Sequence, residues 1–470
     1  MNLIFGGLLI IVIISAGWLT ILPMRHIGLS ERTATSFVIG AVALPFVLFL
    51  LRSITHLPIF GETTSAYVLV ILLVILSIIL FWITRPWRNL SMQAIRTSLK
   101  TPLGTQILIA AISCTIIVFY YQVVQGLQKP IFGWDEYSFW LYAAKLIYLN
   151  HGSTTVMLHD AYNTYPLGFP FLVALAYQFT GGIHIVTAKW LSAILTTFML
   201  IAMFSLLRRL GVKSLFALLA IAVTVWGSRI FLWYNFLAFG EMSYVDTYVL
   251  GVFYLSAWFY TKEQKDLLIA GLLLGLTCFL RVDGIYITLF TLVLFLLCVP
   301  HKERKKLLKG HFVVPFAALL LPPIIIWEGF KIFFHAHGWT TRINLTELSF
   351  RLQPSFLQIM WQAIWHTISN VTIYPIMVVL VCLLLFQIVY RTRAITFLTL
   401  LSITQIVYLF VAYLTVFSRF EAMHASSMDR YLLRIDPLIA VAFIFLIGLT
   451  PPRNKDNAKE NNNRAYPTHR

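Results

Sequence analysis

The sequence predicts an all-α polytopic membrane protein, with about thirteen transmembrane helices and with interfacial helices in its first outer loop. Hydrophobic residues make up 59% of the 470 residues and charged residues only 11%, against roughly one quarter in soluble domains. The apolar residues run in continuous stretches and not in the short alternating segments of a membrane barrel. Helices satisfy their own backbone groups in lipid, so the continuous stretches are expected to be helical.

Each apolar segment has about the length that crosses ~30 Å of hydrocarbon, which takes roughly 20 helical residues. The segments between 247 and 300 are short, and we expect them to be tilted or partly buried in protein. The predicted segments are 3–22, 35–51, 66–83, 105–124, 186–207, 214–234, 247–261, 267–280, 285–300, 312–330, 371–390, 394–417 and 431–449.

The basic residues orient these segments. A net charge of +17 could indicate a nucleic-acid partner, but Lys and Arg stand in short clusters between apolar segments, as orientation signals do. We therefore expect no nucleic-acid partner. With the N-terminus outside and the C-terminus in the cytoplasm, most basic residues fall on the inner side, including the HKERKK block at 301–306.

Three regions follow from this topology. Residues 1–104 form an N-terminal extension with three spans, and residues 105–450 form the core, with outer loops at 125–185 and 331–370. The tail 451–470 is polar and has little apolar surface to bury, so it is predicted to be disordered.

The first outer loop carries an adjacent carboxylate pair, Asp135 and Glu136. One carboxylate of such a pair can take a proton from an acceptor hydroxyl, while its neighbour holds a metal, a sugar hydroxyl or the geometry of the first. The alternative is that the pair caps the interfacial helix predicted over 137–149, because acids favour a helix start. In that helix Phe139, Tyr142 and Leu149 are expected to share one face.

Two tyrosines of the same loop are candidate substrate-binding residues. Tyr137 opens the aromatic-rich helix, and Tyr165 stands beside Pro166, where the chain enters the next apolar segment. Anchoring in the aromatic belt of the membrane interface explains such tyrosines equally well, and the residues alone favour it.

Two acidic residues stand just before the segment predicted at 247–261. Asp246 stands where the segment begins, and a carboxylate so near hydrocarbon suggests function by default. Glu241 is expected to be an ordinary solvated loop carboxylate.

Arg281 and Asp283 stand at a predicted break between two short helices. Fourteen residues from Leu267 to Leu280 bring Arg281 to the outer side at 1.5 Å per residue. Guanidinium groups recognise phosphate oxygens well, so the break is a candidate phosphate site. The alternative is an Arg–Asp pair that satisfies itself.

A last charged group lies at the outer end of the final segments. Arg419, Asp429, Arg430 and Tyr431 stand close to Arg434 there, and such a group suggests contact with an anionic head group. Snorkelling at a helix end accounts for Arg434 alone. The sequence predicts no metal-ligating motif, although a divalent metal at the carboxylates remains open.

Four stretches resemble motifs of the GT-C superfamily of membrane glycosyltransferases, most closely its protein O-mannosyltransferase and aminoarabinose transferase branch. They are WDEYSFWLYAAKL at 134–146, YPLGFPFL at 165–172, SYVDTYVLG at 243–251 and GLLLGLTCFLRVDG at 271–284. The resemblance covers roughly 105–449 and departs from the family where Arg281 replaces a common lysine.

The resemblance implies an inverting glycosyltransferase of the plasma membrane, with its active site on the outer or periplasmic side. The implied donor is a polyprenyl-phosphate-linked sugar, and the implied acceptor is a hydroxyl of a glycan, lipid or protein. Asp135 would be the general base and Glu136 would help to position it, while Arg281 and the group around Arg430 would stabilise phosphate charge.

A transporter or flippase of a lipid-linked or anionic substrate is the alternative function. Charges near helix breaks would serve it as well. Against it, transporters usually place their sites near the midplane, whereas these charges gather on one side. A structural assembly factor is a third interpretation.

Overall fold

The regular structure is helical throughout the part of the chain that the computed structural model describes. This part comprises residues 3–21, 27–84, 103–131, 135–154, 165–226, 229–335, 347–370, 392–424 and 428–448. The predicted class of helical membrane protein is thereby confirmed. The predicted segment 371–390 and the tail 451–470 lie outside the described residues.

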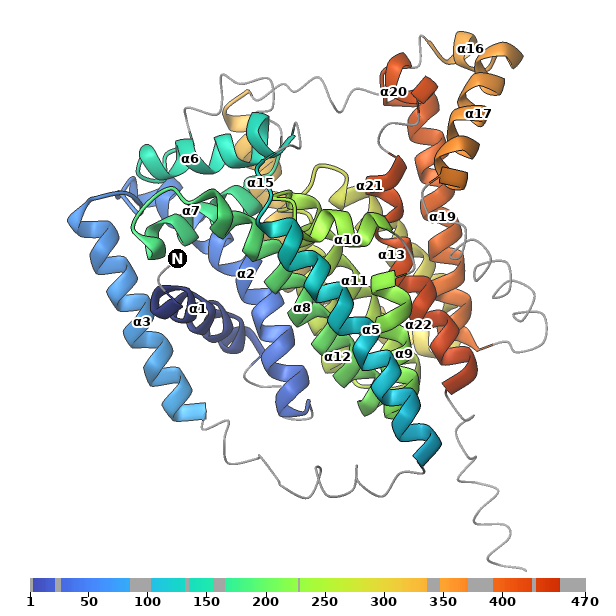
Figure 1. Ribbon diagram of the computed structural model, residues 1–470, viewed down its shortest axis with the longest axis horizontal. Helices are drawn as coiled ribbons and strands as arrows, with labels where there is room; N and C mark the ends of the chain where they lie inside the picture. The colour runs from blue at the N-terminus through green and yellow to red at the C-terminus, as the bar shows by residue number, and fades with distance from the viewer. Residues whose placement is uncertain are drawn as a thin grey trace, which may run out of the picture.

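The helices follow one another as the sequence orders them (Figure 1). They are α1 (Leu3–Ile21), α2 (Leu29–Thr55), α3 (Thr64–Thr84), α5 (Leu103–Leu127), the π-helical turn η2 (Glu136–Trp140), α6 (Leu141–Leu149), α7 (Gly168–Thr180), α8 (Ile185–Arg209), α9 (Ser214–Trp226), α10 (Arg229–Asn235), α11 (Gly240–Thr261), α12 (Gln264–Thr277), α13 (Gly284–Cys298), α14 (His301–Leu307), α15 (Gly310–Phe333), α16 (Leu348–Arg351), α17 (Pro354–Asn370), α19 (Arg393–Thr415), α20 (Arg419–His424), α21 (Met428–Leu432) and α22 (Ile435–Gly448).

Within the described ranges, 5 helices are long and apolar enough to cross a membrane. These cover Leu29–Thr55, Thr105–Leu127, Ile185–Arg209, Gly310–Phe333 and Arg393–Thr415. Shorter apolar helices of 10–17 residues lie between them, as α9 and α13 do. The count of about thirteen spans therefore stays a prediction. The segment predicted at 214–234 is divided between α9 and α10.

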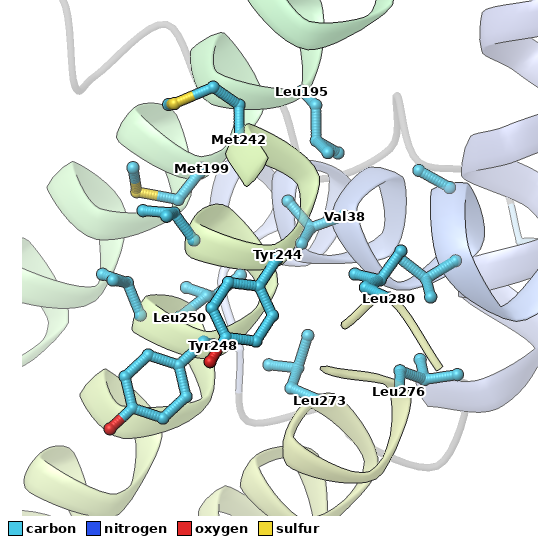
Figure 2. Close-up of a cluster of buried hydrophobic side chains, with 14 of the residues drawn as sticks. Val38, Leu195, Met199, Met242, Tyr244, Tyr248, Leu250, Leu273, Leu276 and Leu280 are labelled. Atoms are coloured by element: carbon cyan, nitrogen blue, oxygen red, sulfur yellow. The ribbon is translucent and has the colours of Figure 1, made fainter. Parts of the chain in front are cut away.

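Helix α11 lies at the centre of the bundle. It packs against α8 and α12 and is buried from Gly240 to Trp258. Figure 2 shows Tyr244 and Tyr248 projecting from α11 among aliphatic side chains such as Leu273. Because these side chains interdigitate on several sides of α11, the helix holds a fixed position relative to its neighbours.

The N-terminal helices share this core. α2 packs against α1, α7 and α8, and most of its side chains are buried. The boundary at residue 104 between an extension and a core stays a prediction. The packing shows that α2 and the helices after 104 bury their apolar faces against one another.

The first outer loop forms helices that lie across one end of the bundle, as Figure 1 shows for α6 and α7. The helix predicted over 137–149 is confirmed as η2 followed by α6. Its predicted face is wrong, because Phe139 is buried while Tyr142 and Leu149 are exposed. The wider π-helical turn at η2 shifts the angular position of the residues before α6, and α-helical spacing does not anticipate that shift.

Arg351 ties the short helix α16 to the end of α19. Its guanidinium donates to the carbonyls of Tyr413 at 2.9 Å and Phe417 at 2.7 Å. It also pairs with Glu347 at 2.8 Å, and Arg419 approaches the same carboxylate at 3.1 Å. These pairs hold α16 and α20 together at the end of the bundle that carries Asp135. We call it the Asp135 end.

Two glycines permit the close approach of α1 and α2. A methyl group on Gly17 would stand 1.8 Å from the Ser36 carbonyl oxygen, and one on Gly40 would stand 1.9 Å from that of Ile13. We expect Gly17→Ala to lower the free energy of unfolding by about 1–3 kcal/mol, because the helices must separate. Thermal unfolding of the purified protein measures this. Gly7→Ala on the same helix is the control, since no atom lies within 4 Å of its position; equal losses in the two variants would contradict the prediction.

The Glu347 pairs predict a pH dependence. Arg351, followed by Arg419, lowers the pKa of the Glu347 carboxyl. A carboxylate whose folded pKa is lowered contributes stability above its unfolded pKa of about 4.3, and this contribution is lost as the pH falls through the folded pKa. We therefore expect Glu347→Gln to lower the unfolding temperature at pH 7 and to converge on the wild type only as the pH falls through the lowered pKa of Glu347, below about 4.3.

Unfolding scans from pH 7 downward measure this difference. Glu62→Gln, at an exposed carboxylate of the described chain, is the control and should show no comparable convergence. A difference at Glu347 that is constant over the whole pH range would exclude the proposed pairs as its cause.

Candidate functional site

Charged side chains from four separate parts of the chain meet at the Asp135 end of the bundle. They come from the start of η2, the first turn of α11, the turn between α12 and α13, and the segment from α21 to the start of α22. We call them the Arg430 cluster, which consists of Asp135, Glu241, Arg281, Asp283, Arg430 and Arg434.

Arg430 joins the two ends of this cluster. Its Nη1 forms an ion pair with Asp135 Oδ2 across 295 residues of sequence and lies 3.7 Å from Glu241 Oε1. The same Glu241 oxygen lies 3.5 Å from Arg281 Nη1. Glu241 thus bridges two guanidinium groups, and no described residue donates a hydrogen bond to Asp135 Oδ1.

Asp283 bridges two guanidinium groups in the same way. Arg281 Nε approaches Asp283 Oδ1 at 2.8 Å, and Arg434 Nη1 approaches Asp283 Oδ2 at 3.2 Å. Arg434 also donates to the hydroxyl of Tyr244. The predicted break at 278–283 is confirmed, and Arg281 and Asp283 do pair with each other, as the alternative interpretation required.

Tyrosine rings enclose the guanidinium groups. Arg281 and Arg434 lie 5.0 and 5.1 Å from the centre of the Tyr431 ring. The Tyr244 ring lies at 5.6 and 5.3 Å from the same two groups. Burial raises the pKa of the nearby Tyr165, with Arg281 opposing the shift, so this hydroxyl stays a hydrogen-bond donor. Cation–π contacts of this kind favour a cation where water is scarce.

The cluster becomes more buried with depth. The side chains of Arg430 and Asp135 are 30% and 27% exposed, and those of Arg281 and Asp283 are 12% and 11% exposed. Arg434 at the base is 1% exposed. A molecule that approaches from this end therefore meets Asp135 and Arg430 first. Three guanidinium groups face three carboxylates, so the charges of the cluster balance.

Glu136 points away from Asp135 and has a different role. Its side chain is fully buried, and Oε1 accepts the backbone N–H of Ala238 at 2.8 Å. Lys189 Nζ lies 3.9 Å from the same oxygen. Glu136 thus fixes the chain that leads into α11, which carries Glu241, and it acts as a positioning residue.

The other predicted site residues are divided between the cluster and its surroundings. Tyr137 is 48% exposed on the outer face of η2. Asp246 is buried and accepts a hydrogen bond from Thr196 at 2.8 Å. The side chain of Asp429 lies outside the described residues. Arg419 lies with Glu347 at 3.1 Å, apart from Arg430.

The sequence interpretation misassigned one member of the cluster, Glu241, and left a second, Arg434, open between the charged group and snorkelling at a helix end. Glu241 is 3% exposed inside the first turn of α11, so its assignment as a solvated loop carboxylate is wrong. Arg434 is 1% exposed and paired with Asp283, so snorkelling to the surface is also wrong. The available sequence signal was an acidic and a basic residue at the ends of two apolar segments. It did not reveal their partners, because these come from distant segments.

A second charged group, the Arg209 cluster, lies at the opposite end of α11. Arg209 contacts both oxygens of Glu31, at 3.2 and 3.1 Å, and pairs with both oxygens of Asp266, at 3.2 and 2.9 Å. Tyr254 donates to Glu31 at 3.0 Å, and Thr261 donates to Asp266 at 2.7 Å. These bonds join α2, α8, α11 and α12 and leave the carboxylates buried.

Metal binding has little support in this geometry. Within the described ranges, no three His, Cys, Asp or Glu side chains come together as a set of metal ligands. The carboxylates of the Arg430 cluster face guanidinium groups instead.

Glu136 should matter more for folding than Asp135 does. We expect Glu136→Ala to lower the free energy of unfolding by about 1–3 kcal/mol, because the buried N–H of Ala238 loses its acceptor. Glu136→Gln keeps an acceptor oxygen and should cost less. Asp135→Asn, at a partly exposed position, should unfold close to the wild-type temperature. Thermal unfolding of the three variants measures the order, and a larger loss for Asp135→Asn would contradict it.

No family model, no curated protein and no solved structure matches this chain. The geometry of the Arg430 cluster therefore carries the functional proposal.

Proposed function

We propose that this chain is a membrane glycosyltransferase that moves a sugar from a polyprenyl-phosphate donor to an acceptor hydroxyl. One observation carries the proposal. Asp135 pairs with Arg430, which belongs to one charged cluster with Arg281 and Arg434 at one end of a helical bundle. A carboxylate for the hydroxyl and guanidinium groups for the phosphate are the two chemical functions that such a transfer needs.

Asp135 is the proposed general base. Arg430 holds one oxygen of its carboxylate and leaves the other to accept a hydrogen bond from an acceptor hydroxyl. The ion pair fixes the orientation of the carboxylate before the acceptor arrives, and pre-orientation of this kind is a main source of catalytic rate. Glu136 positions the group through the chain before α11 and does not touch the acceptor.

The arginines are the proposed site of the donor phosphate. Arg430 is the accessible one, Arg281 lies deeper, and the buried Nη2 of Arg434 finds no hydrogen-bond partner in the described ranges. A phosphate would take over guanidinium N–H groups that Glu241 and Asp283 now share. As the sugar leaves, negative charge grows on the phosphate oxygens, where fixed guanidinium groups stabilise it.

The proposal includes the resemblance to the GT-C superfamily and an active site on the extracytoplasmic side of a plasma membrane. The supporting fact is that residues assigned by charge distribution to one side do lie together at one end of the bundle. The donor sugar and the acceptor are to be identified by testing candidate substrates in a transfer assay.

The transporter alternative has one observation of its own. Charged clusters close both ends of α11, one around Arg430 and one around Arg209. A transporter whose two gates open in turn would need a cluster at each end. Sugar-independent movement of a lipid-linked substrate across vesicles would favour this function.

A transfer assay tests the proposal. Purified protein receives a radiolabelled polyprenyl-phosphate sugar, and the release of free lipid phosphate is measured. We expect Asp135→Asn to lose on the order of 10²–10⁴-fold in turnover while it unfolds like the wild type. Glu263→Gln, at an exposed carboxylate before α12, is the control and should keep full activity. Unchanged turnover in Asp135→Asn would sink the general-base assignment.

A further inference from the structure

Asp246 lies between α8 and α11, apart from the Arg430 cluster. Its side chain is fully buried, and Thr196 Oγ1 donates to its Oδ2 at 2.8 Å. Its other oxygen, Oδ1, has no hydrogen-bond partner within the described part of the chain. Among the described residues, no Lys, Arg or His pairs with Asp246. A buried ionised carboxylate without a cation is strongly unfavourable. Asp246 therefore requires a positive charge that none of the described side chains supplies.

Helices α8 and α11 run parallel. At one end Glu136 contacts both Lys189, near the start of α8, and Ala238, just before α11. At the other end Arg209, the last residue of α8, pairs with Asp266, to which Thr261 at the end of α11 also donates. The contact of Thr196 with Asp246 sets the register of the two helices between these ends.

Two serines lie one helical turn nearer the Asp135 end in the same seam. Ser192 precedes Thr196 by four residues, and Ser243 precedes Asp246 by three, so each shares a face with its neighbour. We call these four residues the Asp246 seam. Both serines are buried, at 0% and 1% exposure, and neither hydroxyl bonds to any residue that the structure describes.

Ser192 and Ser243 belong, with Ser36 and Thr399, to a minority of the buried helical hydroxyls in the described chain that lack a partner. Buried hydroxyls in helices commonly donate to the carbonyl four residues earlier. Thr197 on α8 and Thr247 and Ser256 on α11 do so, at 2.7, 2.7 and 2.9 Å. Ser192 and Ser243 do not make this bond. Three buried oxygens of one seam, Asp246 Oδ1 and the two hydroxyls, therefore lack a partner together.

We propose that the Asp246 seam binds a single positive charge, either Na⁺ or a proton, at Asp246 Oδ1. A hard monovalent cation prefers oxygen ligands such as a carboxylate and hydroxyl groups. A proton on Oδ1 would instead turn Asp246 into a donor that a serine hydroxyl accepts. Either charge neutralises the carboxylate: Na⁺ would be shared by Oδ1 and the two hydroxyls, whereas the proton would give one serine hydroxyl a donor. This site does not depend on sugar transfer.

Other groups near the seam do not supply this charge. Lys189 lies seven residues before Thr196 on α8, about 10 Å away along the helix, and faces Glu136. Tyr120 of α5 donates its hydroxyl to Thr197 at 3.0 Å. Neither contacts Asp246.

Two measurements on the purified protein distinguish bound Na⁺ from a bound proton. The unfolding temperature is followed as NaCl replaces choline chloride at constant ionic strength. Infrared spectroscopy at neutral pH looks for the C=O band of a protonated carboxyl group. Bound Na⁺ should raise the unfolding temperature in a Na⁺-dependent way. A bound proton should give an infrared band that Asp246→Asn removes and no specific Na⁺ effect.

Serine variants provide a second test of the site in case Asp246→Asn does not fold. Ser192→Ala and Ser243→Ala should weaken Na⁺ binding by about tenfold, as the loss of one polar contact predicts, or should shift the carboxyl band. Ser256→Ala is the matched control, because Ser256 is equally buried on α11 but has its own acceptor. The proposal is overturned if wild type shows neither a Na⁺ effect nor the band, or if Asp246→Asn or both serine variants behave like wild type.

Discussion

The ion pair between Asp135 and Arg430 is the contact on which the arrangement of the site depends. It joins the first loop of the core to its last helices across 295 residues. Charges in a low-dielectric interior are stable only when they are matched, so the buried members Glu241, Asp283 and Arg434 need their partners in place. Glu241 and Asp283 each bridge two arginines, and the segments that carry them are held at one end of the bundle.

Helix α11 connects this end with the other. Its first turn supplies Glu241 to the Arg430 cluster, and its last residue, Thr261, donates to Asp266 in the Arg209 cluster. At 22 residues the helix is about 33 Å long. Two ion-paired clusters, one at each end of a buried helix, hold α11 in register with its neighbours more firmly than apolar packing alone, because sliding would separate opposite charges.

The two carboxylates of the adjacent pair show why neighbours in sequence can differ in role. Asp135 is partly exposed and faces Arg430, whereas Glu136 is buried and faces the backbone of Ala238. From the sequence alone, either residue could act as a general base or as a helix cap. The π-helical turn at η2 directs one side chain to the cluster and the other into the protein. Asp246 is a third case, since it joins neither cluster and faces hydroxyl groups.

The sequence by itself determined the helical class, the break at Arg281 and the candidacy of Asp135, Asp283, Arg430 and Tyr431, because hydrophobic length and exposed charge are local properties. Only the tertiary structure decided which charges meet. Glu241 was expected to be solvated and Arg434 was left open to snorkelling, yet both are buried, since their partners come from other segments. Burial and pairing depend on contacts across the bundle, and no local pattern of residues encodes them.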